Sequence, residues 1–181
     1  MLSKTLKRLC YPMLILGSLS CLGDEVALRG SSIEVEDGDT LMVSFPDGVK
    51  RIQLTGIDAP ESSENPKFTV DLKRTGLTYE SLMSLGVIAT EHLRKLVRDG
   101  QVYSLRYDPH KLDKYGRIPG ELFTETGNSI NQSMVADGYA IAIAPSQETL
   151  SPLQQQSIKE QRGLWGLLPK PARNWAGIVD P

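Results

Sequence analysis

VEDGDT (residues 35–40) and GIDAPE (residues 56–61) are the stretches of this 181-residue chain that decide its fold. In the first, Asp-Gly before an apolar run is a turn signal. PDG at residues 46–48 is a second turn signal, between two runs of strand-forming residues. We therefore expect a β-hairpin here, with Asp39 and Asp58 at the outer ends of its strands.

Asp39 and Asp58 are candidate metal ligands if the hairpin brings them together. Carboxylate oxygens suit a hard divalent cation, and Glu61 adds another acid one short turn beyond Asp58. Aspartate is also a common turn former, so a purely structural role is the commoner explanation for any one of these residues. The case for a site depends on their combination with a third segment.

That third segment is DKYGR (residues 113–117), which lies between two strand-like runs. With it, the sequence resembles the staphylococcal-nuclease-like (thermonuclease) family, whose markers are a DGDT turn, a GIDAPE-type strand end and a DKYGR loop. All three occur here in the family's order, and the resemblance covers roughly residues 33–175. Three ordered motifs are far more specific than one.

The resemblance implies a role for each matching residue. Asp39 and Asp58 match carboxylates that ligate calcium, and the backbone carbonyl of Ala59 matches a third ligand. Glu61 matches the glutamate that activates the attacking water, and Arg117 matches an arginine that holds the scissile phosphate. A Ca²⁺ ion, a general base and a guanidinium form a coherent set for phosphodiester hydrolysis.

Neighbouring residues are implied in supporting roles. Asp37 and Thr40 flank Asp39 and are expected to support the metal ligands. Lys114 and Tyr115 match residues next to the bound nucleotide. For these two, a loop that packs against the barrel is an equally good explanation.

One position departs from the family pattern. Five residues before Asp58 the family has an arginine that faces the site, whereas this chain has Gln53. An amide carries no charge and cannot clamp a phosphate bidentately. Removing one such charge costs on the order of 10²- to 10³-fold in rate. Arg51 lies on the same strand face, roughly 6 to 7 Å away, and either reaches toward the phosphate in its place or lies on the surface.

The strand and helix signals predict an α+β, mainly β fold, a five-stranded OB barrel with about three helices. The expected strands are short and partly alternating, at 33–37, 41–45, 49–57, 102–107 and 121–124. Helical spacing of apolar residues predicts helices at about 82–97, 130–136 and 150–162.

The connection at residues 62–79 is longer than in the family's compact form. It carries Lys67, Lys73 and Arg74, so it is either a basic lid over the site or a disordered surface insert.

Residues 1–23 have the pattern of an export signal. Three basic residues precede an apolar run at 9–22 that is short for a transmembrane helix. The segment is a secretory signal peptide cleaved near Gly23, a lipoprotein signal that makes Cys21 a lipid anchor, or an uncleaved anchor. We expect a protein that is secreted, periplasmic or lipid-anchored at the cell envelope, with residues 24–181 as one domain.

Charge and composition argue against long-range attraction to nucleic acid, a zinc site and stabilisation by disulfides. The chain has 20 basic and 22 acidic residues, so it gains little long-range attraction to a polyanion and needs a local basic patch or a bound cation. The two histidines lack metal-like spacing, which argues against a zinc site. Both cysteines lie in the export signal, so the domain depends on its core rather than on disulfides.

Two functions of different kind follow. The first is an exported, calcium-dependent nuclease that hydrolyses DNA and RNA with low sequence specificity, as a monomer. The second is a catalytically impaired module of the same fold that binds nucleic acid or a protein partner. The carboxylates and Arg117 favour the first, because a decayed site would lose clustered like charges. Gln53 and the acidic balance favour the second. We expect the nuclease.

Overall fold

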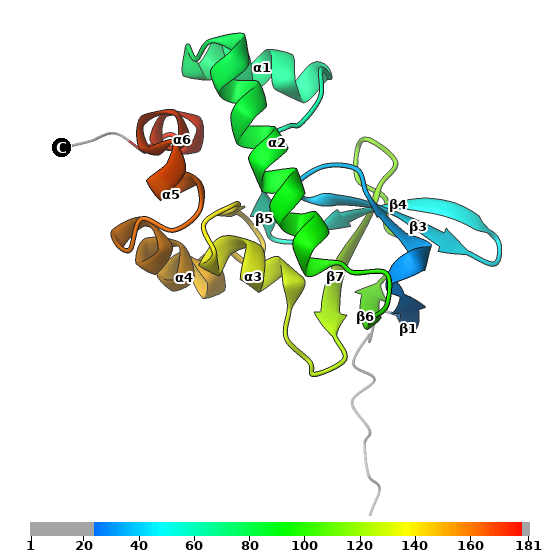
Figure 1. Cartoon of the computed structure of the whole chain (residues 1–181). Coiled ribbons are helices and arrows are strands. Elements are labelled where there is room, and N and C mark those ends of the chain that lie inside the picture. Colours follow the sequence, from blue (N-terminus) through cyan, green and yellow to red (C-terminus); the bar gives the residue numbers. More distant parts are fainter. Residues whose placement is uncertain (1–23, 179–181) are drawn as a thin grey trace, which may run out of the picture.

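The computed structural model describes residues 24–178 (Figure 1). The expected export signal at residues 1–23, with Cys21 as a possible lipid anchor, lies outside the described residues. Within residues 24–178, no helix combines the length and the apolar character needed to cross a membrane.

A curled six-stranded sheet forms one side of the molecule (Figure 1). Its strands lie in the order β1-β6-β7-β4-β3-β2. Their bounds are β1 (Asp24–Arg29), β2 (Ile33–Val35), β3 (Thr40–Phe45), β4 (Gly48–Leu54), β6 (Val102–Tyr107) and β7 (Ile118–Thr124). Neighbours pair antiparallel except β4 and β7, which run parallel. A 3₁₀ turn (Gly30–Ser32) links β1 to β2, and β5 (Ile57–Asp58) pairs separately with β8 (Ile141–Ala142).

The β3–β4 hairpin sets the orientation of the site residues. Its register places Thr40 opposite Gln53 and Leu41 opposite Ile52. Leu41 and Ile52 are fully buried in the core, so residues one position away face the other side of the sheet. Gln53 is thereby directed away from the core, as the alternation predicts.

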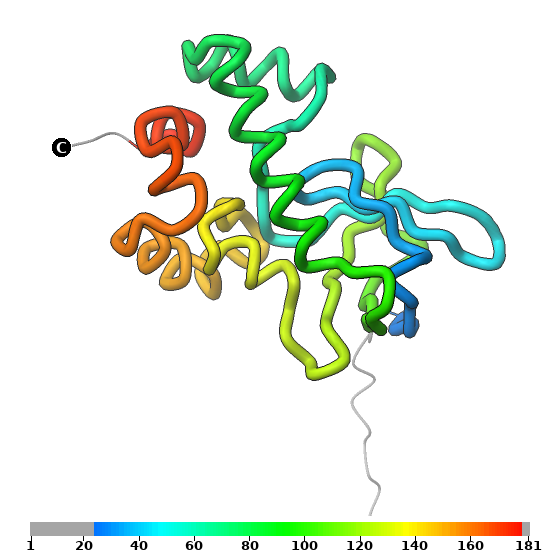
Figure 2. Tube along the Cα trace, viewed as in Figure 1, coloured from blue at the N-terminus to red at the C-terminus, as the bar shows by residue number. Residues whose placement is uncertain are grey.

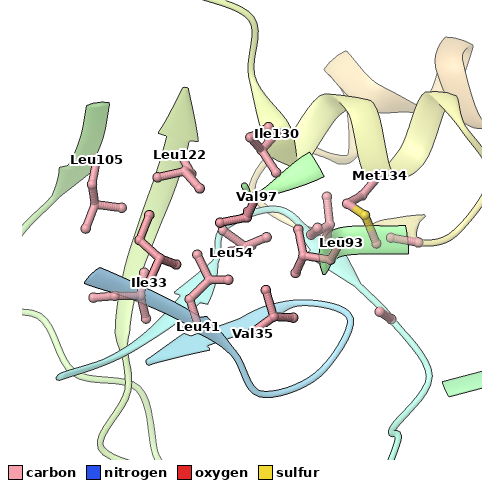
Figure 3. Packing of buried hydrophobic residues seen from close by; sticks show 14 of the residues in the cluster. Ile33, Val35, Leu41, Leu54, Leu93, Val97, Leu105, Leu122, Ile130 and Met134 are labelled. Carbon is pink, nitrogen blue, oxygen red and sulfur yellow. The ribbon is translucent and has the colours of Figure 1, made fainter. Parts of the chain in front are cut away.

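The helices are α1 (Pro66–Thr75), α2 (Tyr79–Leu96), α3 (Ile130–Ala136), α4 (Gln147–Lys159), α5 (Leu164–Leu167) and α6 (Pro169–Ala176). The tube in Figure 2 shows α2 running between the sheet and the helical side of the molecule. Its second half gives Leu93 to the barrel core, where Figure 3 shows it beside side chains from the strands and from α3. Its first half gives Leu82 and Leu85 to a second core with Phe68 and Trp175.

The predicted α+β fold of OB type is confirmed, with differences in its elements. The sheet gains β1, an edge strand in which only Leu28 is buried and Val26 is partly buried, so its apolar alternation is too short to stand out in the sequence. The strand expected at 121–124 begins at Ile118, and that expected at 49–57 ends at Leu54. The described residues hold six α-helices where about three were expected.

The connection at residues 62–79 is not the disordered insert that was one of its two expected forms, because much of it is the helix α1. The side chain of Asn65 accepts a hydrogen bond from the backbone N–H of Phe68, and Pro66 opens the helix. Both are standard helix-start features. Phe68 then buries itself in the second core, which fixes α1 against α2 and α6.

Candidate active site

A hollow of about 260 Å³ at the end of the β3–β4 hairpin gathers most of the predicted residues. We call it the first hollow; its polar walls include Asp39, Gln53, Asp58, Glu61, Lys67 and Arg117. A second hollow shares Glu61, Lys67 and Arg117 with it and adds Asp37, Arg51, Asn65 and Tyr115. Three separate motifs of the sequence therefore meet at one place.

Asp39 joins the DGDT turn to the GIDAPE segment. Its Oδ2 accepts a hydrogen bond of 3.0 Å from the backbone N–H of Ala59, and its Oδ1 accepts one of 3.0 Å from the hydroxyl of Thr40. Asp37 braces the same turn by accepting the N–H of Asp39 at 3.2 Å. A Cβ at Gly38 would lie 2.7 Å from Cβ of Ala59, so glycine is needed for this close approach.

Glu61 is buried between the barrel and two helices. Its Oε2 accepts a hydrogen bond of 2.6 Å from Nδ2 of Asn65, and its Oε1 lies 2.8 Å from Nζ of Lys67. Its backbone touches α2, where a Cβ at Gly86 would come within 1.9 Å of the Glu61 carbonyl oxygen. The carboxylate is therefore fixed by α1 and its backbone by α2.

Arg117 is oriented by its own loop. Asp113 accepts N–H bonds from Tyr115 and Arg117 at 2.8 and 2.9 Å, and its Oδ2 accepts from Nε of Arg117 at 2.8 Å. Nη1 of Arg117 donates to the Thr40 hydroxyl at 3.2 Å. The exposed ring of Tyr115 lies 5.2 Å from the guanidinium and 4.9 Å from Nζ of Lys114. The guanidinium is thus held against the wall that carries Asp39.

Gln53 and Arg51 differ in what they present to this place. Oε1 of Gln53 accepts from the Thr40 hydroxyl at 3.2 Å, so the amide adds no charge to the first hollow. Arg51 lines the second hollow, but its guanidinium donates two hydrogen bonds to the Glu36 carboxylate, from Nε at 2.8 Å and from Nη2 at 2.7 Å. The hypothesis that Arg51 reaches toward a phosphate therefore requires it to leave Glu36.

Lys67, which the sequence offered only as part of a basic lid over the site, contacts the acids of the site directly. Its Nζ lies 3.1 Å from Oδ1 of Asp58, 3.1 Å from the carbonyl oxygen of Ala59 and 3.5 Å from Oδ2 of Asp71. With Glu61, these groups surround the ammonium with oxygens. The Asn-Pro pair at residues 65–66 signalled a helix that begins just before Lys67, but not where that helix would lie.

Burial and repulsion between carboxylates raise the pKa values of two acids of the site, Asp58 and Asp37. Burial raises the pKa of Asp58, and the positive charge of Lys67 offsets part of that rise. Burial, and then the charge of Asp39, raise the pKa of Asp37. Burial alone would lower the pKa of Lys67, but the carboxylates of Asp58 and Glu61 outweigh it and raise that pKa. The acids therefore favour a cation in their midst.

The donor set suits a hard cation, because Asp39, Asp58 and the carbonyl of Ala59 offer only oxygens. Within residues 24–178, no three or more His, Cys, Asp and Glu side chains are already arranged around one point as metal ligands. The cation that bonds to Asp58 and to the carbonyl of Ala59 is the ammonium of Lys67.

Comparison with known proteins identifies the family. Residues 51–166, more than half of the chain, match the family model described as staphylococcal nuclease homologue. The chain belongs to this family. The matched range contains Asp58, Glu61 and Arg117, whereas the DGDT turn precedes it. The resemblance inferred from the three motifs is confirmed.

Relatives of this staphylococcal nuclease homologue include proteins named as endonucleases. Endonuclease YhcR of Bacillus subtilis (strain 168) is 29% identical over 139 residues, which are 72% of this chain and 11% of YhcR. An uncharacterized endonuclease of Escherichia coli is 29% identical over 140 residues, 76% of this chain and 77% of that protein. The uncharacterized protein MJ1439 of Methanocaldococcus jannaschii is 25% identical over 146 residues, 75% of this chain and 70% of that protein. The chain therefore spans only about a tenth of YhcR.

As a staphylococcal nuclease homologue, the chain brings together carboxylates, a guanidinium and a buried glutamate at one hollow. Such a set can hold a cation, bind a phosphate and accept a proton from water. The members that sequence reasoning missed, Asn65 and Asp71, come from α1 or its cap, as does Lys67, which the sequence offered as part of a basic lid.

Proposed function

We propose that this chain is a calcium-dependent nuclease that hydrolyses phosphodiester bonds of DNA and RNA with low sequence specificity. The observation that carries the proposal is the meeting of Asp39, Asp58, Glu61 and Arg117 around one hollow. These residues come from separate strands and loops, and together they provide every group that phosphodiester hydrolysis needs apart from the cation.

Each residue has one task in this proposal. Asp39, Asp58 and the carbonyl of Ala59 hold a Ca²⁺ ion, which when bound neutralises the phosphate and lowers the pKa of a nearby water. Glu61 accepts the proton of the attacking water. Arg117, held in orientation by Asp113, binds the phosphate and stabilises the charge that builds on it during attack.

Low sequence specificity agrees with what the hollows present. Their polar walls offer charged groups, which contact phosphates, and phosphate contacts carry no sequence information directly. Tyr115 is the aromatic residue of the second hollow, half exposed and available to stack on a base. Stacking of this kind tolerates any base.

We include export in the proposal on the sequence of residues 1–23 alone, in which basic residues precede a short apolar run. A secreted or periplasmic nuclease meets nucleic acid outside the cytoplasm, and a lipidated Cys21 would hold it at the cell envelope.

A second candidate is a module of the same fold that binds nucleic acid or a protein partner without cleaving. Gln53 favours it, because the amide leaves the first hollow with one fixed phosphate-binding cation fewer than the family pattern. This candidate predicts a folded protein that does not cleave, and cleavage that appears when Gln53→Arg is introduced.

The test is cleavage of a fluorescent single-stranded oligonucleotide by the purified protein, with Ca²⁺ and with a chelator. We expect cleavage only with Ca²⁺, and Glu61→Gln should lower it by about 10²- to 10⁴-fold. Glu64→Gln is the control, because Glu64 is exposed and bonds to Tyr79 instead. Cleavage by Glu61→Gln at the wild-type rate, or cleavage in chelator, contradicts the proposal.

A further inference from the structure

Lys67 already occupies the place between Asp58, Ala59 and Glu61. Its Nζ lies 3.1 Å from the Asp58 carboxylate, 3.1 Å from the carbonyl oxygen of Ala59 and 2.8 Å from Glu61. Two of these oxygen donors are ones that the proposed function assigns to Ca²⁺. We infer that Lys67 is an internal cation that competes with Ca²⁺ for this position and must leave it before the metal binds.

The competition follows from distances. Calcium binds oxygen ligands at about 2.3 to 2.6 Å. A metal bonded to Asp58 and to the Ala59 carbonyl would therefore fall in the space that the ammonium fills. The ammonium and the divalent metal also repel each other, and more strongly where water is scarce. The lysine and the metal therefore exclude each other.

Neighbouring side chains of α1 and its cap hold Lys67 in this position. Asn65 caps α1 through Phe68 and at the same time donates to Glu61, so the start of the helix is fixed to the site. Asp71 lies one turn further along α1, with Oδ2 3.5 Å from Nζ of Lys67 and no hydrogen-bond partner of its own. That orphan oxygen turns toward the ammonium and completes its oxygen surroundings.

The other carboxylate oxygen of Asp71 connects the surroundings of Lys67 to the second core. Its Oδ1 accepts hydrogen bonds from Arg74, which also donates to the carbonyl oxygen of Trp175 in α6 at 3.0 Å. Trp175 and Phe68 are both buried in the second core. Helix packing therefore places Lys67 at the site, and Lys67 is not a loose surface side chain.

The lysine also has a way out. Its side chain is 29% exposed, and it lines both the first and the second hollow. Its four-carbon stem is flexible, so once its ion pairs break the ammonium can move from the carboxylates toward solvent while α1 stays in place. Displacement then requires the loss of ion pairs but no unfolding.

This inference rests on the proposed function, since it concerns the cation that the nuclease needs. Its first test is calorimetric titration of the full chain with Ca²⁺, without nucleic acid. Lys67→Met should bind Ca²⁺ at least 10-fold more tightly than wild type, because no ion pair has to be broken. Lys73→Met is the matched control, an exposed lysine on the same helix, and should stay within 2-fold. Equal or weaker binding by Lys67→Met, or no binding by either protein, overturns the inference.

A second test uses the wild-type protein, so it does not depend on whether Lys67→Met folds. An amine-modifying reagent followed by mass spectrometry reports the reactivity of each lysine. In chelator Lys67 should react at least 10-fold more slowly than Lys73, and saturating Ca²⁺ should raise its rate at least 5-fold while that of Lys73 stays constant. Equal reactivity of the two lysines in chelator, or a Lys67 rate that Ca²⁺ does not change, overturns the inference.

The inference and the proposed function can fail separately. Cleavage that depends on Ca²⁺ and Glu61, with unchanged metal affinity in Lys67→Met, keeps the function and overturns the inference. Tighter Ca²⁺ binding by Lys67→Met, with no cleavage by either protein, supports the inference and contradicts the function.

Discussion

Asp39 and Glu61 line the same hollow, but different parts of the chain hold them. Asp39 is fixed by a backbone N–H of Ala59 and by the neighbouring Thr40, all within the two barrel motifs. Glu61 is fixed by side chains of Asn65 and Lys67, which belong to the inserted helix. We call these the barrel half and the helix half of the site.

The difference shows how the site is divided. Hydrogen bonds to backbone groups of the barrel give the barrel half a geometry that changes only if the sheet changes. The helix half depends on one flexible lysine and one amide, so it can rearrange when a metal arrives. The barrel half therefore carries the proposed metal ligands and, through its bond to Thr40, the phosphate-binding Arg117, whereas the helix half carries the lysine that competes with the metal. Substitutions can test the two halves one at a time.

After Glu61→Gln, the largest effect on the cleavage rate is expected in the barrel half. Arg117→Ala should lower the cleavage rate by about 10²- to 10³-fold, because it removes a fixed charge from the phosphate. Arg117→Lys should recover little of this, since an ammonium cannot replace the guanidinium fork that bonds to Asp113 and Thr40. Lys111→Ala, an exposed lysine of the same loop, is the control. Full activity of Arg117→Ala would remove the barrel half from the mechanism.

The next largest effect, on stability, is expected at the contact between Glu61 and α2. Gly86→Ala places a methyl group 1.9 Å from the Glu61 carbonyl oxygen, far inside van der Waals contact, so α2 must move. Overpacking of this kind costs about 1 to 3 kcal/mol of unfolding free energy. Gly100→Ala is the control, because nothing lies within 4 Å of its Cβ position. Denaturant unfolding measures both, and equal stability would contradict the tight packing.

Gln53→Arg tests the missing charge of the barrel half. The new guanidinium enters the first hollow, where Gln53 now accepts a bond from Thr40, and should raise the cleavage rate on the order of 10-fold. The double variant with Arg51→Ala separates the two explanations. If Arg51 supplies the charge after leaving Glu36, Gln53→Arg gains little in wild type and much more in the double variant.

The smallest effect is expected for the amide of the helix half. Asn65→Ser keeps an oxygen that can cap α1 but removes the amide donor to Glu61, so cleavage should fall a few-fold with little change in stability. Asn65→Ala removes both bonds and should also cost about 1 kcal/mol of unfolding free energy. Thermal melting beside kinetics separates the two roles. Equal activity of all three proteins would show that the Asn65 amide is not needed to position Glu61.

The sequence was most informative where a turn determines the geometry. Asp39, Asp58 and Arg117 belong to short turns and strand ends, whose residues fix their conformation locally. Their convergence could be anticipated from three motifs in order. The strand face shared by Arg51 and Gln53 also followed from simple alternation.

The sequence offered the helix half only as one of two alternatives, a basic lid, and could not choose between them for a physical reason. The cap at Asn65 announces a helix, but whether that helix covers the site depends on Phe68 reaching a core that contains Trp175, over 100 residues away. Such long-range packing leaves no local pattern. The pairing of Arg51 with Glu36 is missing from the sequence for the same reason, since it depends on how β2 and β3 lie beside β4.

The most direct test of a site in two halves is the Ca²⁺ dependence of oligonucleotide cleavage, measured side by side for wild type and Lys67→Met. We predict that both proteins cleave and that Lys67→Met reaches half its maximal rate at a Ca²⁺ concentration at least 10-fold lower. Coincident curves would contradict it, because they would show that Lys67 does not stand between the carboxylates and the metal.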